Sequence, residues 1–401
     1  MKKNIYNFLR AAWCGLVLVI VIYLSSCGTV QPRTPFSIDA SWLAPGFDTN
    51  GWPTLGYDAA HSGVFPAMSR ALSGHVVWHR NVGGPIFSAP VLSDGVVYVG
   101  STSGNLLAFN AQTGTLLWHQ PIGQFLNDAT PVVVGRVIFV GENRTQVSAL
   151  DATTGHQLWT IDTHEIIKAA PTYADGLVLI NAGTTTFALD AQTGMTRWHF
   201  HESGSGWPTT ATPTVQGQMV YVAQGTSTVL YALNLLTGRK LWSYNVGDRL
   251  ISTPIVVGQT LVLGTWMGTI AGLDASSGTL LWTYNVNRLF KHGGSQDGIA
   301  GSPASGAGLI FFGTFSGHVL ALDARSGQLR WWHSVSAPVL GVPVVAGNTL
   351  YISGGQSMYA LDMTGGIQRW ILALGDVRND SALGQERLYV GTVEGDLFAI
   401  D

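Results

Sequence analysis

Short apolar runs alternate with small and polar residues along most of the chain. Residues 96–99 read Val-Val-Tyr-Val, residues 102–104 read Thr-Ser-Gly, and residues 105–110 read Asn-Leu-Leu-Ala-Phe-Asn. Runs of this length, rich in Val, Tyr and Phe and bounded by Gly, Ser, Asp or Asn, are typical of β-strands joined by tight turns. Here the pattern predicts four strands, at 89–92, 96–99, 105–110 and 115–119.

One motif, Ala-x-Asp-x-x-Thr-Gly-x-x-x-Trp, recurs at intervals of about forty residues, with Asn for Asp or Ser for Thr in some copies. The glycine supplies a positive φ in the hairpin turn, and the Asp carboxylate can accept N–H groups of that turn. The small Ala and Gly residues leave room for the Trp ring between neighbouring units. The marking tryptophans are Trp78, Trp118, Trp159, Trp198, Trp242, Trp282, Trp331 and Trp370.

A proline lies 27 to 29 residues before the Trp in seven copies, from Pro90 to Pro343. Each unit of about thirty residues therefore holds four short strands, A to D in chain order. A four-stranded unit that repeats in this way is typical of a β-propeller, in which each blade buries its faces against its neighbours. The composition agrees, with 50 Gly, 14 Trp and only 11% charged residues.

The first and last copies of the motif are each incomplete. Trp78 follows Ser73-Gly74 but has no Ala-x-Asp before it, and Ala399-Ile400-Asp401 has no turn after it. We predict that one blade takes strands A to C from residues about 381–401 and strand D from about 75–80. This pairing leaves no open sheet edge. The predicted fold is all-β: an eight-bladed propeller of four-stranded antiparallel blades over residues 51–401, closed by its N- and C-terminal strands.

The N-terminal residues have the layout of a secretory signal. Lys2, Lys3 and Arg10 precede an apolar stretch that ends at Leu24, and Ser25-Ser26-Cys27 follow. The stretch is short for a membrane span, which needs roughly 20 apolar residues. An uncleaved signal anchor is the alternative.

The sequence Leu-Ser-Ser-Cys at residues 24–27 resembles the bacterial lipobox, in which the Cys thiol receives a diacylglycerol. The resemblance implies lipidation of Cys27, a signal at residues 1–27, a tether at 28–50, and an extracytoplasmic protein anchored to the cell membrane or the outer membrane. Cys14, the other cysteine, lies within the signal, so the mature chain has no disulfide. Residues 51–63, Trp52 and Pro53 among them, are expected to form a packed lead-in that covers the ring.

The charge of the chain excludes one class of partner. The formal net charge is −3, and no long basic run occurs. Proteins that bind nucleic acid carry clustered Lys and Arg, so we expect no nucleic-acid partner.

Loop lengths point to one face of the ring. The D-to-A connections at 199–207 and 287–301 are longer than the others, and D–A and B–C connections of a propeller emerge on the same face. Function is often carried by loops on a rigid scaffold. The alternative is that most of these residues are merely solvated. The candidate partner contacts are Trp207, Trp266, His201, Arg249, His292, Asp297 and Arg378, with Asp248 and Asp380 on the same face.

The motif and its spacing resemble the PQQ-type repeat of quinoprotein-like propellers, over about Trp52 to Asp401. One function implied by this resemblance is a dehydrogenase that holds PQQ and calcium on the propeller axis. Typical alcohol-oxidising members have a disulfide between adjacent cysteines, which this chain lacks.

A lipoprotein that consists of one such ring also resembles the BamB family, whose members assemble outer-membrane β-barrels and bind partner proteins without a cofactor. We therefore expect a scaffold that binds envelope proteins through the D–A/B–C face and the membrane through its lipid. No catalytic residue, metal or cofactor is expected. A surface propeller that binds or senses a ligand is the remaining alternative.

Overall fold

The structure is a computed structural model that describes residues 37–43, 52–65, 71–123, 130–142, 144–201, 209–224, 228–289, 297–299, 301–378, 380–384 and 386–401. The chain divides into residues 1–37 and a compact unit of residues 38–401. The predicted signal, Cys27, Trp207 and His292 lie outside the described residues. Among the residues described, no helix has the length and apolar character needed to cross a membrane.

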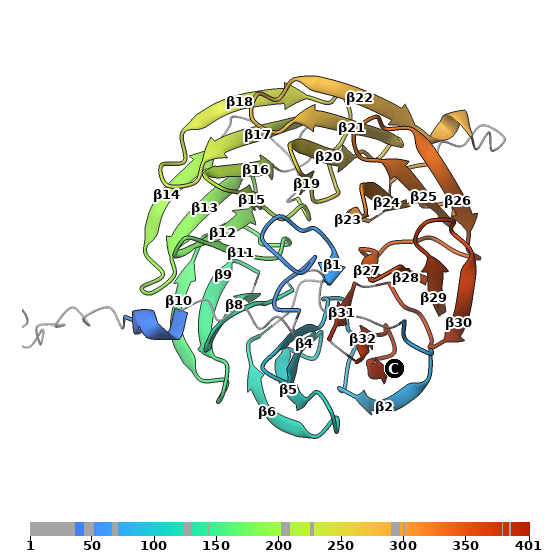
Figure 1. Ribbon diagram of the computed structural model, residues 1–401. Coiled ribbons are helices and arrows are strands. Elements are labelled where there is room, and N and C mark those ends of the chain that lie inside the picture. Colours follow the sequence, from blue (N-terminus) through green and yellow to red (C-terminus); the bar gives the residue numbers. More distant parts are fainter. Residues whose placement is uncertain are drawn as a thin grey trace, which may run out of the picture. The chain divides into compact units, whose positions relative to one another are not determined.

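The described strands form eight antiparallel sheets arranged as blades around a common axis (Figure 1), which confirms the predicted fold class. The first four blades are β3 (Val91–Ser93), β4 (Val96–Ser101), β5 (Asn105–Asn110) and β6 (Leu116–Pro121); β7 (Val132–Val134), β8 (Val137–Glu142), β9 (Gln146–Asp151) and β10 (Gln157–Asp162); β11 (Thr172–Ala174), β12 (Leu177–Ala182), β13 (Thr185–Asp190) and β14 (Thr196–His201); and β15 (Thr214–Gln216), β16 (Met219–Ala223), β17 (Val229–Asn234) and β18 (Lys240–Asn245).

The remaining four blades complete the ring. They are β19 (Ile255–Val257), β20 (Thr260–Gly264), β21 (Thr269–Asp274) and β22 (Leu280–Asn285); β23 (Ala304–Gly306), β24 (Leu309–Gly313), β25 (His318–Asp323) and β26 (Leu329–Ser334); β27 (Val344–Ala346), β28 (Thr349–Gly354), β29 (Ser357–Asp362) and β30 (Gln368–Ala373); and β31 (Ser381–Leu383), β32 (Leu388–Gly391), β33 (Asp396–Ile400) and β2 (Val76–Asn81). The 3-10 helices are η1 (Ala40–Leu43) and η2 (Val286–Arg288).

The repeated Trp joins each blade to the next one. Trp118, for example, lies opposite Ala108 in its own sheet, and its indole N–H donates to the carbonyl of Ala152 in blade 2 over 3.1 Å. The ring also lies against Gly155 of the Thr-Gly turn in blade 2, where a Cβ would come within 2.7 Å of it. The same bond to the next blade recurs for all eight tryptophans. The motif is therefore the joint between blades, because it places one large ring against two small residues.

The Asp of the motif holds the turn that follows it, as predicted. The Oδ1 atom of Asp190 accepts the N–H groups of Gln192 and Thr193 at 3.1 and 2.9 Å. Its Oδ2 atom accepts from the guanidinium of Arg197 at 2.6 Å, and these bonds lower the pKa of Asp190 although partial burial opposes them. The carboxylate thus fixes the turn beside which the Trp of the preceding blade packs.

Strand β2 closes the ring by pairing with β33 in the order β2-β33-β32-β31, as the incomplete motifs predicted. The peptide N–H of Gly74 donates to the carbonyl of Asp401 at 2.7 Å, and the N–H of Asp401 donates to the carbonyl of His75 at 3.0 Å. Within the uninterrupted blade 1, the N–H of Gly114 donates to the carbonyl of Asn110 and the N–H of Asn110 donates to the carbonyl of Thr115, both at 2.8 Å. Residues from the two ends of the chain therefore rebuild one complete motif.

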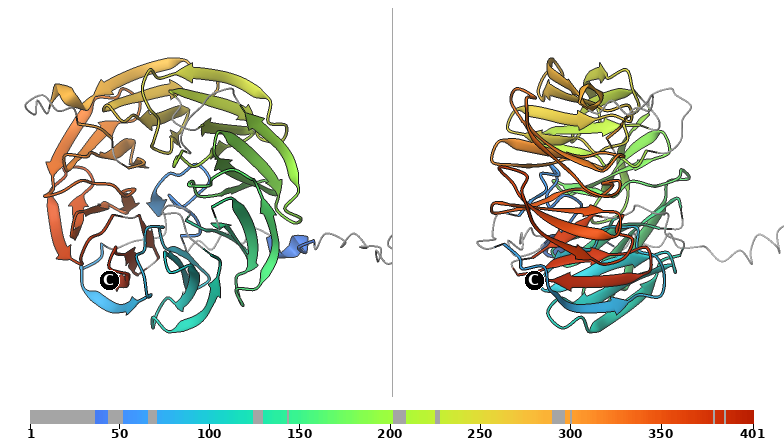
Figure 2. Two further views of the ribbon diagram at one scale, coloured as in Figure 1. Left: turned by 180° about the vertical axis from the view of Figure 1, so that it is seen from behind. Right: turned by 90° about the vertical axis from the view of Figure 1, so that its right-hand side faces the viewer.

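Residues 52–65 lie along the axis, inside the ring of A strands. Strand β1 (Val64–Phe65) pairs in parallel with β27 and adds a fifth strand to blade 7, and Figure 2 shows β1 near the axis. The carbonyls of Pro53, Ala59 and Ser62 each accept an N–H at 2.8 Å from the inner strands of blades 2, 4 and 6. The predicted lead-in is therefore a packed segment, and it fills the centre of the ring by bonding to the inner strands.

Part of the predicted tether also belongs to the propeller unit. Ile38 and Leu43 are buried, and the N–H of Ile38 donates to the carbonyl of Gln192 in a C–D turn. The carbonyl of Trp42 accepts from the N–H of Arg136 in an A–B turn, and the Arg136 guanidinium lies 4.2 Å from the Trp42 ring centroid. The expected tether of residues 28–50 is thus interrupted at 38–43, because two apolar side chains and two backbone bonds fix this stretch to blades 2 and 3.

Candidate functional site

The described residues carry two features of the D–A/B–C face that can bind another molecule: an aromatic surface over blades 5 and 6, and a pocket on the axis. Both are built from connections between strands. A–B and C–D turns lie at the opposite face, because successive strands of a blade are antiparallel.

The first feature consists of Arg249, Trp266, Met267 and Phe315, and we call it the Arg249–Trp266 surface. The Arg249 guanidinium lies 5.3 Å from the centroid of the Trp266 ring, and the Phe315 ring centroid lies 4.7 Å from that of Trp266. Trp266 is 42% exposed and Met267 is 44% exposed. Exposed aromatic and Arg side chains in contact are typical of protein-binding surfaces.

Asp248 makes this surface rigid. Its carboxylate accepts the N–H of Arg249 at 2.6 Å and the N–H of Met267 at 2.7 Å. It therefore binds the D–A connection before blade 5 to the B–C turn of that blade. Among the described residues no carboxylate forms an ion pair with Arg249.

Asp297 takes a different role from the one expected. Its side chain is 1% exposed, and its Oδ1 atom accepts the N–H of Ser316 at 2.9 Å. Asn287 accepts the N–H of Asp297 at 2.7 Å and donates to its carbonyl at 3.0 Å. Buried in this way, Asp297 ties the long D–A connection to the B–C turn that carries Phe315, and does not itself present a carboxylate to solvent.

The structure separates the other predicted contacts. His201 is exposed at the end of β14 in blade 3, where its Nδ1 atom lies 3.3 Å from the hydroxyl of Thr185. Arg378 is exposed in the connection between blades 7 and 8, and its guanidinium pairs with Asp376 at 2.7 Å. Arg249, Trp266 and Asp297 therefore belong to one structural cluster, and His201 and Arg378 belong to different blades from that cluster.

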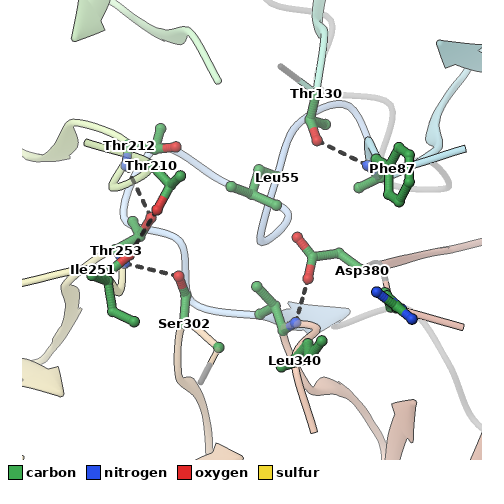
Figure 3. Close-up of a pocket in the computed structure, with 14 residues that line it drawn as sticks. Leu55, Phe87, Thr130, Thr210, Thr212, Ile251, Thr253, Ser302, Leu340 and Asp380 are labelled. Carbon is green, nitrogen blue, oxygen red and sulfur yellow. Dashed lines mark hydrogen bonds between the residues drawn. The ribbon is translucent and has the colours of Figure 1, made fainter. Parts of the chain in front are cut away.

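The second feature is an axial pocket of about 360 Å³, and Leu55 of the lead-in forms part of its wall (Figure 3). The rest of its wall comes from the residues just before the A strands. The wall includes the hydroxyls of Thr130, Thr210, Thr212, Thr253 and Ser302.

A chain of hydrogen bonds links neighbouring blades around this pocket. The hydroxyl of Thr130 accepts the N–H of Ala89 at 2.9 Å, and that of Thr253 accepts the N–H of Thr212 at 3.0 Å. The hydroxyl of Ser302 accepts the N–H of Thr253 at 2.8 Å (Figure 3). The positions of these hydroxyls are therefore fixed by the blades themselves.

Asp380 is the one carboxylate in the described wall of the pocket. Its Oδ1 atom accepts the N–H of Val342, and burial raises its pKa to about 6. Arg378, also in the wall, is paired with Asp376 instead. Asp380 is therefore partly buried in the pocket without a cationic partner among the described residues.

Sequence analysis missed the hydroxyl residues, although a signal for them was present. Thr130, Thr212, Thr253 and Ser302 each come directly before the proline that opens strand A, and Asp380 precedes Ser381 at the corresponding place. The proline marks the register of the repeat. The polar residue before it is the one that the ring gathers at the axis.

The pocket does not fit the PQQ and calcium that the resemblance to quinoprotein-like propellers implies as one possibility. Calcium takes roughly six to eight oxygen ligands, several of them carboxylates. The described wall holds only the Asp380 carboxylate, and the described residues contain no group of three His, Cys, Asp or Glu that could hold a metal ion.

Comparison with known proteins gives a family match. The family model described as outer membrane protein assembly factor BamB matches residues 67–124, 108–264, 207–296 and 266–401. The outer membrane protein assembly factor BamB of Shewanella oneidensis is 24% identical over 248 residues, 56% of this chain and 60% of that protein. The protein of the same description from Burkholderia pseudomallei is 27% identical over 222 residues, 51% of this chain and 58% of that protein. The chain thus spans about 60% of the length of these relatives.

Solved structures share the fold at low sequence identity. BamB from Moraxella catarrhalis has a TM-score of 0.67 at 17% identity, over 81% of this chain and 99% of that chain. A quinohemoprotein alcohol dehydrogenase from Pseudomonas putida has a TM-score of 0.73 at 16% identity, over 89% of this chain and 78% of that chain. These likenesses show the propeller fold alone, since scaffolds and oxidoreductases both use it.

Proposed function

Because the chain belongs to the family described as outer membrane protein assembly factor BamB, we propose that it is a protein-binding scaffold of the bacterial cell envelope and not an enzyme. In a host with an outer membrane, its role is to support the assembly of outer-membrane β-barrel proteins. In this proposal Cys27 carries the lipid that holds the protein to the membrane.

The Arg249–Trp266 surface carries this proposal. Trp266 is exposed and held between Arg249 and Phe315, and Asp248 fixes the turn on which it stands. A pre-ordered aromatic side chain loses little conformational freedom when a partner binds, so the surface suits tight contact. The partner that fits it presents an apolar side chain to Trp266 and Met267 and a carboxylate to Arg249.

The place of residues 38–43 supports an orientation for the proposed scaffold. This stretch is bonded to an A–B turn and a C–D turn, through Arg136 and Gln192, and so lies at the face opposite the Arg249–Trp266 surface. Eleven positions separate Cys27 from Ile38. A lipid on Cys27 would thus be joined to the propeller at this opposite face, which would leave the Arg249–Trp266 surface open to a partner.

The competing function is a quinoprotein oxidoreductase. It is less well supported, because the axial pocket has a single carboxylate in its described wall. Purified protein supplied with PQQ and Ca²⁺ should therefore show no dye-linked oxidation of alcohols. Turnover in that assay would contradict the proposed function.

The proposal is tested by site-specific crosslinking in living cells. A photoreactive amino acid at position 267 of the full-length protein should crosslink to an outer-membrane assembly protein, and the double variant Arg249→Ala/Trp266→Ala should lose that product. The same variant should lower the amount of folded β-barrel proteins in the outer membrane.

Trp332 provides the matched control. It is 49% exposed on β26, outside the Arg249–Trp266 surface, so Trp332→Ala should leave crosslinking and β-barrel levels unchanged. If deletion of the whole protein leaves the β-barrel proteins at their normal level, the assembly role is wrong.

A further inference from the structure

The axial pocket holds polar groups that the propeller itself does not use. Its wall comes from the D–A connections of several blades and from Leu55, and none of the residues of the Arg249–Trp266 surface lines it. From these groups we propose that the pocket binds a neutral, polyhydroxylated ligand the size of a mono- or disaccharide. This inference is independent of the proposed scaffold function.

Three hydroxyls in the wall are held in place with a hydrogen still to donate. Thr130, Thr253 and Ser302 each use an oxygen lone pair to accept a backbone N–H at 2.8 to 3.0 Å. A hydroxyl that accepts one bond retains its own O–H as a donor. No acceptor for these three O–H groups occurs among the hydrogen bonds of the described residues. Ordered donors facing a cavity are suited to a ligand that brings its own acceptors.

Thr212 is the strongest indication of a ligand. Its side chain lines the pocket and is 1% exposed, and its hydroxyl oxygen has no hydrogen-bond partner among the described residues. Buried polar atoms without partners are rare in native proteins, because leaving one unpaired costs about 1–3 kcal/mol. A ligand hydroxyl at this position would satisfy Thr212.

Asp380 supplies an acceptor for the hydroxyls of such a ligand. Among the described residues, one of its carboxylate oxygens accepts a bond, from the N–H of Val342. Arg378 is paired with Asp376, and no cationic side chain in the described part of the chain forms an ion pair with Asp380. A partly buried carboxylate that accepts from two neighbouring hydroxyls is a chemically suitable contact for a sugar.

The remaining wall and the size of the pocket agree with this class of ligand. Phe87, Leu340 and Ile251 provide apolar contacts, which match the apolar face that a sugar ring carries beside its hydroxyl edge. Arg378 and Asp380 are the charged side chains of the described wall, and Arg378 is already paired with Asp376, so the wall offers no free cation that would favour an anionic ligand. Its volume of about 360 Å³ is within the usual range for small-molecule sites.

The test is a calorimetric titration of the whole mature protein with glucose, N-acetylglucosamine and maltose. At least one sugar should give saturable heat. Thr212→Val and Asp380→Asn should each weaken its binding about tenfold, whereas Thr212→Ser, which keeps the hydroxyl, should restore most of the affinity. Thr349→Val is the matched control, because Thr349 is also 1% exposed but lies in β28, away from the pocket.

Each variant should first show a cooperative melt, so that a loss of binding is not a loss of fold. The inference is wrong if none of the three sugars binds, or if binding survives both Thr212→Val and Asp380→Asn. Binding of PQQ with Ca²⁺ that Thr212→Val abolishes would also overturn it, because the pocket would then belong to a cofactor. Trp266→Ala should leave sugar affinity unchanged, which separates this inference from the proposed scaffold function.

Discussion

The indole N–H of Trp370 donates to the carbonyl oxygen of Leu72 over 2.8 Å and so joins residues 298 positions apart in the chain. Trp331 makes the equivalent bond to Met363, 32 positions away, at 3.0 Å. The joint that closes the ring is thus the same as the joint within the continuous chain. Closure by the two ends of the chain is therefore part of the repeat and not an accessory contact.

Removal of residues 392–401 should destabilise the whole ring. The truncation deletes β33 and leaves β2 and β32 without their partner strand. We expect the melting temperature, measured by circular dichroism, to fall by more than about 10 °C, since losses of several kcal/mol shift it by that much.

Single substitutions give the control for this truncation. Trp370→Phe and Trp331→Phe each lose one indole hydrogen bond and some ring volume, and each should cost about 1–3 kcal/mol. Similar losses would show that the closing joint resembles the others. A truncated protein that melts at the same temperature as the complete one would contradict the closure.

Gly278→Ala should be strongly destabilising. Gly278 has φ +72°, and an added Cβ would lie 2.5 Å from the Trp242 ring of the preceding blade. Backbone strain and the displaced ring together should cost about 2–5 kcal/mol in urea unfolding.

Gly308→Ala separates the two causes. Gly308 has φ +79°, but nothing lies within 4 Å of its added Cβ. This variant should show the backbone strain alone, about 1–2 kcal/mol. Equal losses for the two variants would mean that the Trp242 contact adds nothing at Gly278.

Asp380→Asn should stabilise the protein at neutral pH. Burial raises the pKa of Asp380 to about 6 from an ordinary value of 3.8, so the folded state holds a proton that the unfolded state releases between these values. The stability that Asp380 contributes is complete below pH about 4 and is lost as pH rises through about 6. Asparagine keeps an acceptor for the Val342 N–H but carries no charge.

The expected gain for Asp380→Asn at pH 7 is about 1–3 kcal/mol, and it should vanish at pH 4. Urea unfolding of both proteins across this range measures it. A gain that persists unchanged at pH 4 would show that ionisation of Asp380 is not the cause.

Cys27→Ala should release the protein from the membrane. Acyl chains bind the bilayer by about 0.8 kcal/mol for each buried CH₂ group, and without the thiol no lipid can be attached. Labelled palmitate should no longer be incorporated, and the protein should move to the soluble fraction. Cys14→Ala, within the predicted signal, should keep both the label and the membrane fraction; equal labelling of Cys27→Ala would exclude Cys27 as the lipid site.

The blades and their closure could be predicted from the amino-acid sequence. Strands, turns and the Trp joint depend on residues close together in the chain. The pattern of Ala149, Asp151, Gly155 and Trp159 recurs in later copies, and this repetition made it recognisable. In the first copy the expected strands at 89–92, 96–99, 105–110 and 115–119 differ by no more than two residues at either end from the observed ones. The unfinished motif at Asp401 was enough to predict its partner strand.

The residues on the axis and the contacts between loops could not be predicted from the sequence, because they depend on how the blades pack. Thr212, Ser302 and Asp380 share a pocket because the ring brings successive blades around one centre, and no short spacing in the sequence records that convergence. Asp297 looked like a surface carboxylate and is buried, because its bond to Ser316 spans two connections. Trp266 contacts Arg249 and Phe315, which come from separate connections. Its surroundings are therefore set by the packing of the blades and could not be predicted from its own segment.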